Sequence, residues 1–544
     1  MTRTYTDLVP TFPDRTDWTL AHVLESRSKQ TPDEVFLIAP EEGLRVTYGE
    51  IRREAQSIAA GIYERGALSG DRVLIMAANS SAFVRTWLGT AISGLVQVPI
   101  NTAYEGEFLR HQVHVTNPKF AVIDDHLAHR FVQLRTEFPS IEHFWVIDKG
   151  QAQESIQQLQ ETGWSASEWQ NLLDVAPESF PIPAAQDLAS IFFTSGTTGP
   201  SKGVAMPHAQ MYFFADEVVS LTRLTHKDTY MTVTPLFHGN AQFMAAYPAL
   251  VAGAKLVIRS KFSASRWVDQ IREEGVTVTN LIGVMMDFIW KQDSRATDSD
   301  NPLRCVFAAP TASSILSEFK DRYDVEAFVE VFGLTETSAP ILSPYGEDRP
   351  PGAAGLLARD FFEIRLVNPD TDEEVPVGEI GELVIRPKFP WTCSLGYYGM
   401  DDRTAEAWRN LWFHTGDALK RDTDGWYYFV DRYKDALRRR GENISSYEVE
   451  QAVLSHATVT ECAVIAVAAE SEAGEDEVMA VVVTNGDVDP KEIWGFCKGR
   501  IPECAIPRFM RFVDALQRTP SEKIQKSVLR EEGITPNTHD RTTV

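Results

Sequence analysis

Short apolar stretches alternate with amphipathic stretches of helix length along most of this chain, and this alternation limits its fold more than any other feature. Residues 48–64 carry apolar side chains at helical spacing after a capping Thr47, and RVLIMA, from Arg72, is typical of a buried strand. Further strands are expected at 96–100, 121–123, 144–147, 190–193, 230–234, 255–258 and 304–308. Strands separated by helices predict an α/β fold with mostly parallel, helix-covered sheets.

The pattern changes twice towards the C-terminus. Between about residues 345 and 430, short strands such as EIRLV, GELVI and GWYYFV are separated by Gly, Pro, Asp and Asn, which predicts a small barrel-like β subdomain. After Asp431 a basic stretch precedes the helical pattern SSYEVEQAVLSH and two apolar strands. The chain of 544 residues is too long for one ordinary domain. We predict a large N-terminal domain over 1–433, a small mobile α/β domain over 434–544, and a hinge at Lys434.

The charge and cysteine content exclude several classes of protein. The formal net charge of -25 repels nucleic acid and anionic lipid, so no nucleic-acid partner is expected. The five cysteines are odd in number and form no C-x-x-C pair, which argues against a disulfide framework or a zinc site. No signal-like segment opens the chain, and no apolar run is long enough to span a bilayer. A cytoplasmic protein without an integral membrane segment is therefore expected.

A glycine-rich loop follows the expected strand at 190–193, in the sequence SIFFTSGTTGPSKGV. Such a loop aims backbone N–H groups and hydroxyls at phosphate oxygens, and its lysine adds a positive charge. A P-loop that starts at Gly196 requires Gly at position 201 and Ser or Thr at position 203. This chain has Ser201 and Gly203 there, so the P-loop motif is excluded. From these residues alone, a flexible turn remains an alternative. The candidate phosphate ligands are Thr194, Ser195, Gly196, Thr197, Thr198 and Lys202.

Four further segments carry residues suited to nucleotide chemistry: PLFHG from Pro235, EVFGLTET from Glu330, WFHTGD from Trp412 and RTPSEKIQK from Arg518. A threonine beside a carboxylate suits a phosphate held next to Mg²⁺, which prefers oxygen ligands. A carboxylate at a tight turn can accept two hydrogen bonds from a ribose. Taken singly, each segment also has an ordinary structural explanation, such as a buried histidine, a polar turn or an exposed surface lysine.

The loop TSGTTGPSKG resembles the signature loop of the adenylate-forming superfamily, which comprises acyl-CoA synthetases, firefly-type luciferases and peptide-synthetase adenylation domains. The other four segments match this family in the same order, across nearly the whole chain. Ser201 stands where the family has proline, Phe332 where it has tyrosine, and Glu522 where glycine precedes the lysine. The stretch RRRGENISSYEVE looks most like crotonobetaine/carnitine-CoA ligase-like members.

The resemblance implies a role for each motif residue. It makes Lys523, His238, Thr335 and Glu336 the catalytic residues, with Glu336 as the Mg²⁺ ligand. It implies that the nucleotide is bound by the candidate residues of the glycine-rich loop together with Phe332, Asp417 and Arg432. The remaining assignments are Gly441 and Arg439 for coenzyme A, Lys434 for the hinge, and Gly239, Ala308, Ala309 and Ala339 for the acyl pocket.

The implied reaction is that of an acyl-CoA ligase, in which a carboxylic acid, ATP and CoA give acyl-CoA, AMP and pyrophosphate through an acyl-adenylate. No fixed charge is obvious in the expected pocket walls, so we expect an uncharged short or medium aliphatic or aryl-aliphatic acid. The alternatives are an adenylating enzyme that loads a carrier protein, a luciferase-like oxygenase, and a non-catalytic nucleotide-binding homologue. A homodimer is left open.

Overall fold

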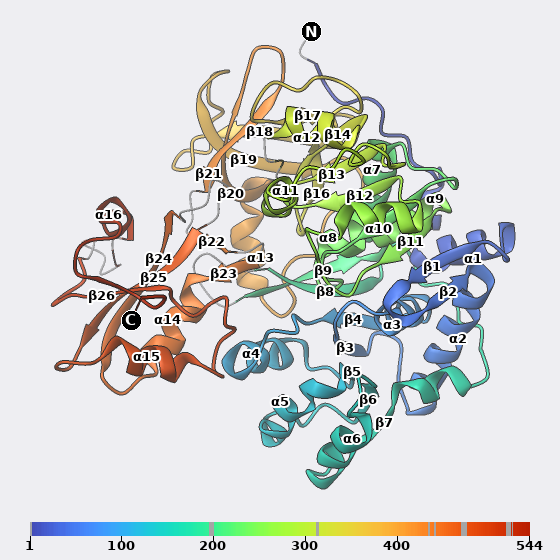
Figure 1. Cartoon of the computed structure of the whole chain (residues 1–544), viewed down its shortest axis with the longest axis horizontal. Coiled ribbons are helices and arrows are strands. Elements are labelled where there is room, and N and C mark those ends of the chain that lie inside the picture. Colours follow the sequence, from blue (N-terminus) through green and yellow to red (C-terminus); the bar gives the residue numbers. More distant parts are fainter. Residues whose placement is uncertain are drawn as a thin grey trace. The chain divides into compact units, whose positions relative to one another are not determined.

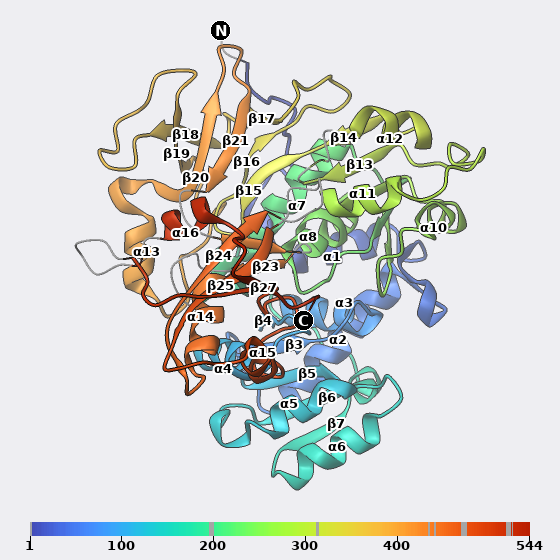
Figure 2. The same ribbon diagram turned by 60° about the vertical axis from the view of Figure 1, so that its left-hand side comes forward.

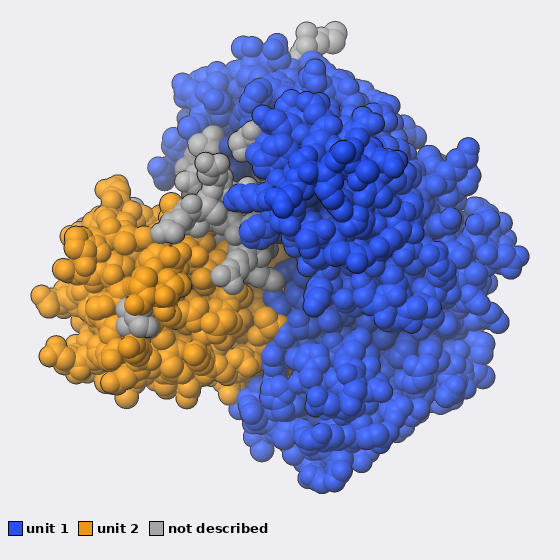
Figure 3. All heavy atoms as spheres, in the orientation of Figure 1, with its two compact units in different colours: residues 1–102, 116–192, 204–431 blue, residues 103–115, 193–203, 432–544 orange. Residues whose placement is uncertain are grey.

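The computed structural model describes residues 3–194, 201–309, 311, 315–432, 436–439, 442–468, 476–517, 524 and 526–543. The chain forms two compact units, coloured separately in Figure 3. The larger comprises Met1–Thr102, Thr116–Phe192 and Val204–Asp431, and the smaller comprises Ala103–Val115, Phe193–Gly203 and Arg432–Val544. The predicted hinge residue, Lys434, lies outside the described residues, so the domain boundary at 433/434 stays a prediction.

Two mostly parallel sheets form the α/β part of the chain (Figures 1 and 2). The described strands of one sheet run in the order β14 (Ala327–Val329), β13 (Cys305–Ala308), β12 (Val278–Leu281), β10 (Thr229–Thr232), β11 (Lys255–Ile258), β1 (Val35–Ala39) and β2 (Leu44–Thr47). Those of the other run β7 (Ser165–Glu168), β6 (His143–Ile147), β5 (Phe120–Asp124), β3 (Arg72–Met76), β4 (Val96–Pro99), β8 (Leu188–Thr194) and β9 (Lys202–Pro207). Strands such as β1, β3, β5 and β13 are mostly apolar and buried along nearly their whole length, as expected for strands covered on both faces.

Helices cover both faces of the sheet that contains β12. Alternate residues of neighbouring strands enter different core clusters: Val278 and Phe307 join one, and Leu281 and Val306 join the other. The predicted helix at 48–64 is confirmed as α2 (Tyr48–Glu64), where Thr47 and Glu50 form a capping box. The other main helices here are α1 (Leu20–Gln30), α3 (Ser81–Ile92), α6 (Ala152–Glu161), α7 (His208–Thr222), α9 (Tyr247–Ala252), α10 (Trp267–Glu274), α11 (Gly283–Trp290) and α12 (Leu316–Tyr323).

A third sheet, built of antiparallel strands, completes the larger unit. It begins at Val331, earlier than the boundary near 345 expected from the sequence. Its described strands run in the order β15 (Val331–Leu334), β16 (Ser338–Leu342), β17 (Ala353–Leu357), β21 (Tyr427–Arg432), β20 (Phe413–Arg421), β19 (Ile380–Pro387) and β18 (Phe362–Val367). The helix α13 (Asp401–Ala407) lies in the connection between β19 and β20.

The smaller unit has its own apolar core. Leu437, Ile444, Val453 and Trp494 are buried together, and Phe108 of α4 (Gly106–Thr116) joins them. The described strands β24 (Val459–Ala468), β25 (Asp476–Thr484), β26 (Phe509–Phe512) and β27 (Thr538–Asp540) form one sheet, and β22 (Ala436–Arg439) pairs with β23 (Glu442–Ser445). Its helices include α14 (Ser446–Leu454), α15 (Pro490–Cys497) and α16 (Lys526–Glu532). The mixed α/β fold class is confirmed.

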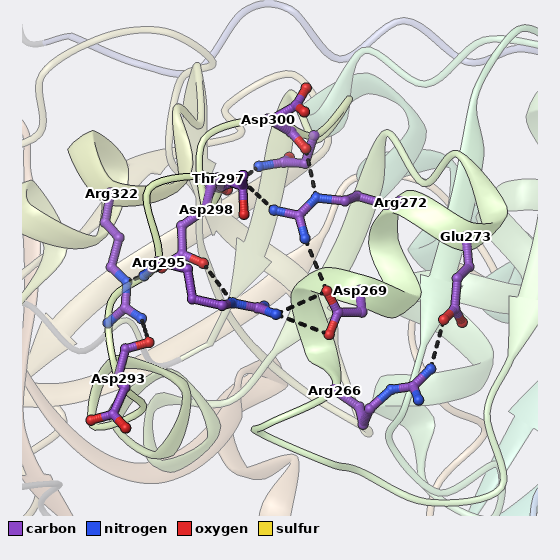
Figure 4. A network of polar contacts seen from close by, with 11 residues as sticks. Arg266, Asp269, Arg272, Glu273, Asp293, Arg295, Thr297, Asp298, Asp300 and Arg322 are labelled. Carbon is purple, nitrogen blue, oxygen red and sulfur yellow. Dashed lines mark hydrogen bonds and ion pairs between the residues drawn. The ribbon is translucent and has the colours of Figure 1, made fainter.

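A network of ion pairs fastens the connection between α11 and β13 to its surroundings (Figure 4). Asp298, which is 2% exposed, accepts a 2.7 Å hydrogen bond from Nε of Arg322 and a 3.1 Å hydrogen bond from the backbone N–H of Arg295. Nη1 of Arg295 lies 3.1 Å from both carboxylate oxygens of Asp269 on α10. Burial would raise the pKa of Asp298, but these hydrogen bonds outweigh it and hold the pKa below its usual value.

No helix within the described part of the chain has both the length and the apolar character needed to cross a membrane.

Candidate active site

The turn between β15 and β16 carries Thr335 and Glu336. Gly333 makes the turn possible, because a Cβ there would lie only 2.4 Å from the carbonyl oxygen of Ser338. Nε2 of Gln210 on α7 donates a 2.8 Å hydrogen bond to the carbonyl oxygen of Thr335. The turn is therefore held both by its own hairpin and by a helix distant in sequence.

Glu336 is fixed by contacts from the 393–398 segment. It is 8% exposed, and the hydroxyl of Tyr397 donates a 3.0 Å hydrogen bond to its Oε1. The N–H of Ser394 donates a 2.8 Å hydrogen bond to the backbone carbonyl of Glu336. Burial, together with the neighbouring Glu336 carboxylate, raises the pKa of the Tyr397 phenol, so this phenol stays a hydrogen-bond donor.

The surroundings of Glu336 fit a magnesium ion that is shared with a nucleotide. The described residues contain no group of three or more His, Cys, Asp or Glu side chains that could enclose a metal. Mg²⁺ in nucleotide sites uses one or two carboxylates and completes its octahedron with phosphate oxygens and water. A single oriented carboxylate beside a threonine hydroxyl suits that coordination.

Phe332 on β15 offers an aromatic surface three residues before Thr335. Its ring stacks on that of Phe429 from β21, with centroids 6.1 Å apart and an interplanar angle of 27°. Phe332 is half-buried, whereas Phe429 is 46% exposed. A flat base can stack on such a surface without a phenolic hydroxyl, because stacking uses the ring face.

Asp417 lies on β20, in a turn-like stretch that is held by the buried carboxylate of Glu382. Asp417 is 2% exposed, and its N–H donates a 3.0 Å hydrogen bond to Oγ1 of Thr415. Glu382 on β19 accepts a hydrogen bond from the N–H of Gly416 through Oε1 and contacts Nδ1 of His414 through Oε2, each at 3.0 Å. Burial opposes ionisation of Glu382, but these partners hold its pKa below the usual value. The backbone of Arg432 ends β21, and its side chain is not described.

His238 and Gly239 begin the helical stretch that follows β10. His238 is the N-cap of α8 (Gly239–Ala241), which continues through a π-helical segment at Gln242–Ala246 into α9. The His238 ring packs against Phe237 with centroids 4.7 Å apart. Gly239 is half-buried and close to Phe243. Short π-helical segments within α-helices often occur at functional sites.

The three alanines predicted for the acyl pocket differ in their surroundings. Ala308 is fully buried in the core cluster that contains Leu281, and Ala309 is half-buried. Ala339 is also fully buried, and its N–H donates a 3.0 Å hydrogen bond to Oε2 of Glu217 on α7. Burial raises the pKa of Glu217 well above the usual value, although the hydrogen bond from Ala339 opposes this. Their role in an acyl pocket stays a prediction.

The ends of the glycine-rich loop belong to the smaller unit. Oγ1 of Thr194 lies 3.5 Å from the carbonyl oxygen of Lys202. The N–H of Ser201 donates a 2.7 Å hydrogen bond to Oε1 of Glu448 on α14, and the Ser201 carbonyl lies 2.8 Å from Nε2 of His111. Burial raises the pKa of Glu448. The N–H of Ser201 is a donor that proline, the family residue at this position, does not have.

Arg439, expected to contact coenzyme A, is part of the core of the smaller unit. It is 5% exposed, its Nε lies 2.7 Å from Oε2 of Glu477, and its Nη1 donates a 2.9 Å hydrogen bond to the carbonyl of Cys504. These contacts assign Arg439 a structural role, and a role in binding CoA stays a prediction. The other predicted site residues outside the described part are Lys523, Ser195, Gly196, Thr197, Thr198 and Gly441.

Sequence reasoning missed the residues that position the site. Three such residues act from segments that lie 34 to 125 residues away in the chain. Tyr397 holds Glu336, Glu382 holds the turn at Gly416, and Gln210 holds Thr335. None of them lies in a motif, so no local pattern identifies them. Only the buried polar residue Gln210, within the apolar sequence of α7, carried a signal that could have been noticed.

Comparisons with known proteins identify the family of this chain. Residues 24–398 match the family described as AMP-binding enzyme, and residues 448–523 match the AMP-binding enzyme C-terminal domain. A crotonobetaine/carnitine–CoA ligase of Salmonella heidelberg is 30% identical over 493 residues, which cover 89% of this chain and 93% of that protein.

Two solved structures share the fold. The o-succinylbenzoate CoA synthetase of Bacillus subtilis has a TM-score of 0.77 and 23% identity, over 94% of this chain and 98% of that one. The amide bond synthetase of Marinactinospora thermotolerans has a TM-score of 0.78 and 21% identity, over 94% and 99%. The resemblance carried by the five motifs is thereby confirmed, and the chain belongs to the AMP-binding enzyme family.

Proposed function

We propose that this enzyme is an ATP-dependent acyl-CoA ligase that makes an acyl-adenylate from a carboxylic acid and ATP and transfers the acyl group to coenzyme A. The observation that carries the proposal is the β15–β16 turn, where Thr335 and the Tyr397-bound Glu336 follow the aromatic surface of Phe332. This one turn offers groups for a phosphate, a metal ion and a base. A CoA ligase that is 30% identical over 89% of the chain supports the same reaction.

The first half-reaction brings together two anions, the acid's carboxylate and the α-phosphoryl group. Positive charge and alignment at their meeting point lower this barrier. Mg²⁺, held by Glu336 and the phosphate oxygens of ATP, would supply part of that charge. In the proposal, Lys523 supplies the rest, Thr335 orients the α-phosphoryl group, and the 194–202 loop holds the leaving pyrophosphate.

The proposed contacts of the adenylate come from side chains that the sequence analysis identified. Phe332 stacks on the adenine, and Asp417, fixed by the Glu382 turn, accepts hydrogen bonds from the ribose. Arg432 is proposed beside the ribose and phosphates. His238 orients the carboxylate of the acid.

In the second half-reaction a thiolate attacks the acyl carbon of the adenylate, the C–S bond forms, and AMP leaves with the electron pair of the C–O bond. Lys523 serves only the first half, so the C-terminal domain is proposed to turn about Lys434 between the halves. The segment around Gly441 then lines the path of the thiol, where the absence of a Cβ leaves room for a pantetheine arm.

Lys523→Ala tests the assignment. It is expected to abolish pyrophosphate release with every acid but to leave thioester formation from a supplied acyl-adenylate largely intact. Lys491→Ala, at an exposed position on α15, is the control and should change neither half-reaction. Equal loss of both half-reactions in Lys523→Ala would contradict the role of Lys523.

The acceptor is tested separately. Wild-type protein, ATP and a panel of carboxylic acids are incubated with CoA, with a carrier protein or with an amine, and the product is identified by mass spectrometry. A thioester of CoA is expected. Formation of an amide or of a loaded carrier protein instead would mean that an amine or a carrier protein, rather than CoA, is the acceptor. If no AMP forms with any acid, adenylation is rejected. The cytoplasmic location and the homodimer stay predictions.

A further inference from the structure

A cluster of three neutral polar side chains lies where β10 and β12 end. We define it as the 234–280 cluster, formed by Thr234, Asn240 and Asn280. Nδ2 of Asn280 donates hydrogen bonds to Oγ1 of Thr234 at 3.0 Å and to Oδ1 of Asn240 at 2.5 Å. Oγ1 of Thr234 donates to the same Oδ1 of Asn240 at 3.1 Å. The three side chains therefore hold one another in a single arrangement.

The cluster has unused hydrogen-bonding capacity. Asn280 is 0% exposed, and its Oδ1 has no hydrogen-bond partner among the described residues. Leaving a buried acceptor unpaired costs about 1–3 kcal/mol, so native structures seldom keep one without a use. Asn240 is half-buried, and because its Oδ1 faces Thr234 and Asn280, its Nδ2 points away from the cluster.

The backbone around the cluster is rigid. Asn79, which is 8% exposed, donates a 2.8 Å hydrogen bond to the carbonyl of Thr234 and accepts a 2.7 Å hydrogen bond from the N–H of Leu236. Oγ1 of Thr232 lies 3.0 Å from Oγ1 of Thr234. A polar group presented by this cluster is thus pre-oriented, which lowers the entropic cost of binding a ligand there.

The cluster also lies at an edge of the sheet where ligands bind. β10, β12 and β13 are parallel, so their carboxyl ends share one edge, and open α/β sheets bind ligands outside that edge. Asn240 belongs to α8, two residues after His238 and two residues before the start of the π-helical segment at Gln242. His238 is the residue that the proposed function places beside the acid's carboxylate.

From these observations we infer that the 234–280 cluster binds an uncharged polar group of the acid, so that the substrates are carboxylic acids carrying a hydroxyl, keto or amide group. The side chains of the cluster are all neutral, as are Asn79 and Thr232, which contact Thr234, and this disfavours a charged substituent. The inference rests on the proposed ligase function. It narrows the uncharged aliphatic or aryl-aliphatic acid expected from the sequence to one that carries a neutral polar substituent.

The experiment compares matched pairs of acids in a pyrophosphate-release assay. Each pair has the same carbon chain, with and without one hydroxyl, and the hydroxyl moves one carbon at a time away from the carboxylate. For the wild type, we expect kcat/KM to favour one hydroxy acid over its alkyl partner by about tenfold, the value of one well-formed neutral hydrogen bond.

Asn240→Leu should remove this preference by lowering kcat/KM for the hydroxy acid, while the alkyl acid is used as well as before or better. Asn240→Ser, which keeps a small polar group, should retain part of the preference and guards against a Leu variant that fails to fold. Asn485→Leu makes the same change at an exposed asparagine and should leave the ratio unaltered.

The outcomes separate the inference from the function beneath it. If alkyl acids are adenylated as well as every hydroxy partner, or if Asn240→Leu leaves the ratio unchanged, the cluster holds only a buried water and the inference is overturned, while the ligase assignment stands. If no acid releases pyrophosphate in the wild type, the proposed function fails and the inference fails with it.

Discussion

The hydroxyl of Tyr397 donates a 3.0 Å hydrogen bond to Oε1 of Glu336, the carboxylate proposed to bind Mg²⁺. The two residues are 61 positions apart in the chain, and both are buried. Groups that form hydrogen bonds with a metal-binding side chain fix its orientation, and their loss commonly lowers metal affinity by about 10- to 100-fold. In the proposed site, the phenol would orient the metal ligand without contacting the metal.

Tyr397→Phe should raise the Mg²⁺ concentration needed for half-maximal pyrophosphate release by about tenfold. The ring stays, so packing is kept, while the hydrogen bond that orients Glu336 is lost. Tyr398→Phe, at the half-buried neighbouring position, is the matched control. A Mg²⁺ titration that is identical in Tyr397→Phe and wild type would show that Glu336 does not depend on this contact.

Glu382→Ala should weaken the binding of ATP more than it slows the catalytic step. Without the carboxylate, the N–H of Gly416 and the ring of His414 lose their acceptor, and the turn that presents Asp417 loosens. We expect KM for ATP to rise by about tenfold, the effect of roughly 1.4 kcal/mol, with a smaller change in kcat. Glu379→Ala, at an exposed position nearby, should behave as wild type. An unchanged KM for ATP would show that Glu382 does not support the proposed contact between Asp417 and the ribose.

Phe332 provides a test of the aromatic surface. Phe332→Ala removes the ring that stacks on Phe429, and isothermal titration should show ATP binding weakened by about tenfold, since aromatic pairs contribute about 0.5–1.5 kcal/mol beyond buried area. Phe332→Tyr restores the residue usual in the family and should bind ATP at least as well as wild type. Equal affinity in the Ala variant would place the base elsewhere.

The Asp298 network predicts a pH-dependent contribution to stability. Asp298→Asn should lower the free energy of unfolding at pH 7 by about 2 kcal/mol, because a buried carboxylate loses charge-assisted hydrogen bonds from Arg322 and Arg295. The folded pKa lies below the unfolded value of about 3.9. The stabilisation is therefore complete above that value and disappears as the pH falls through the folded pKa.

Denaturant unfolding from neutral to acidic pH measures this effect. The wild-type and Asp298→Asn curves should differ at pH 7 and converge in acid, whereas Asp300→Asn, an exposed carboxylate in the same connection, should follow wild type throughout. A difference that persists at low pH would mean that packing, rather than charge, accounts for the effect of the substitution.

Local patterns predicted much of the fold. The helix at 48–64 and the strand at 255–258 have their predicted bounds, since a capping box and short apolar runs act over a few residues. The start of the β-rich part was predicted too late, because Val331–Leu334 is part of a motif and carries no alternation of its own. The contacts of Tyr397, Glu382 and Gln210 depend on how distant segments pack, which periodicity does not encode.

The Ser201–Glu448 hydrogen bond has a consequence for protein engineering. A signature loop exchanged from a relative with proline at this position would lack the N–H and leave the half-buried Glu448 carboxylate without that donor. Chimeras built by swapping this loop should therefore carry a compensating change at residue 448, because this hydrogen bond couples two segments that lie 247 residues apart in the chain.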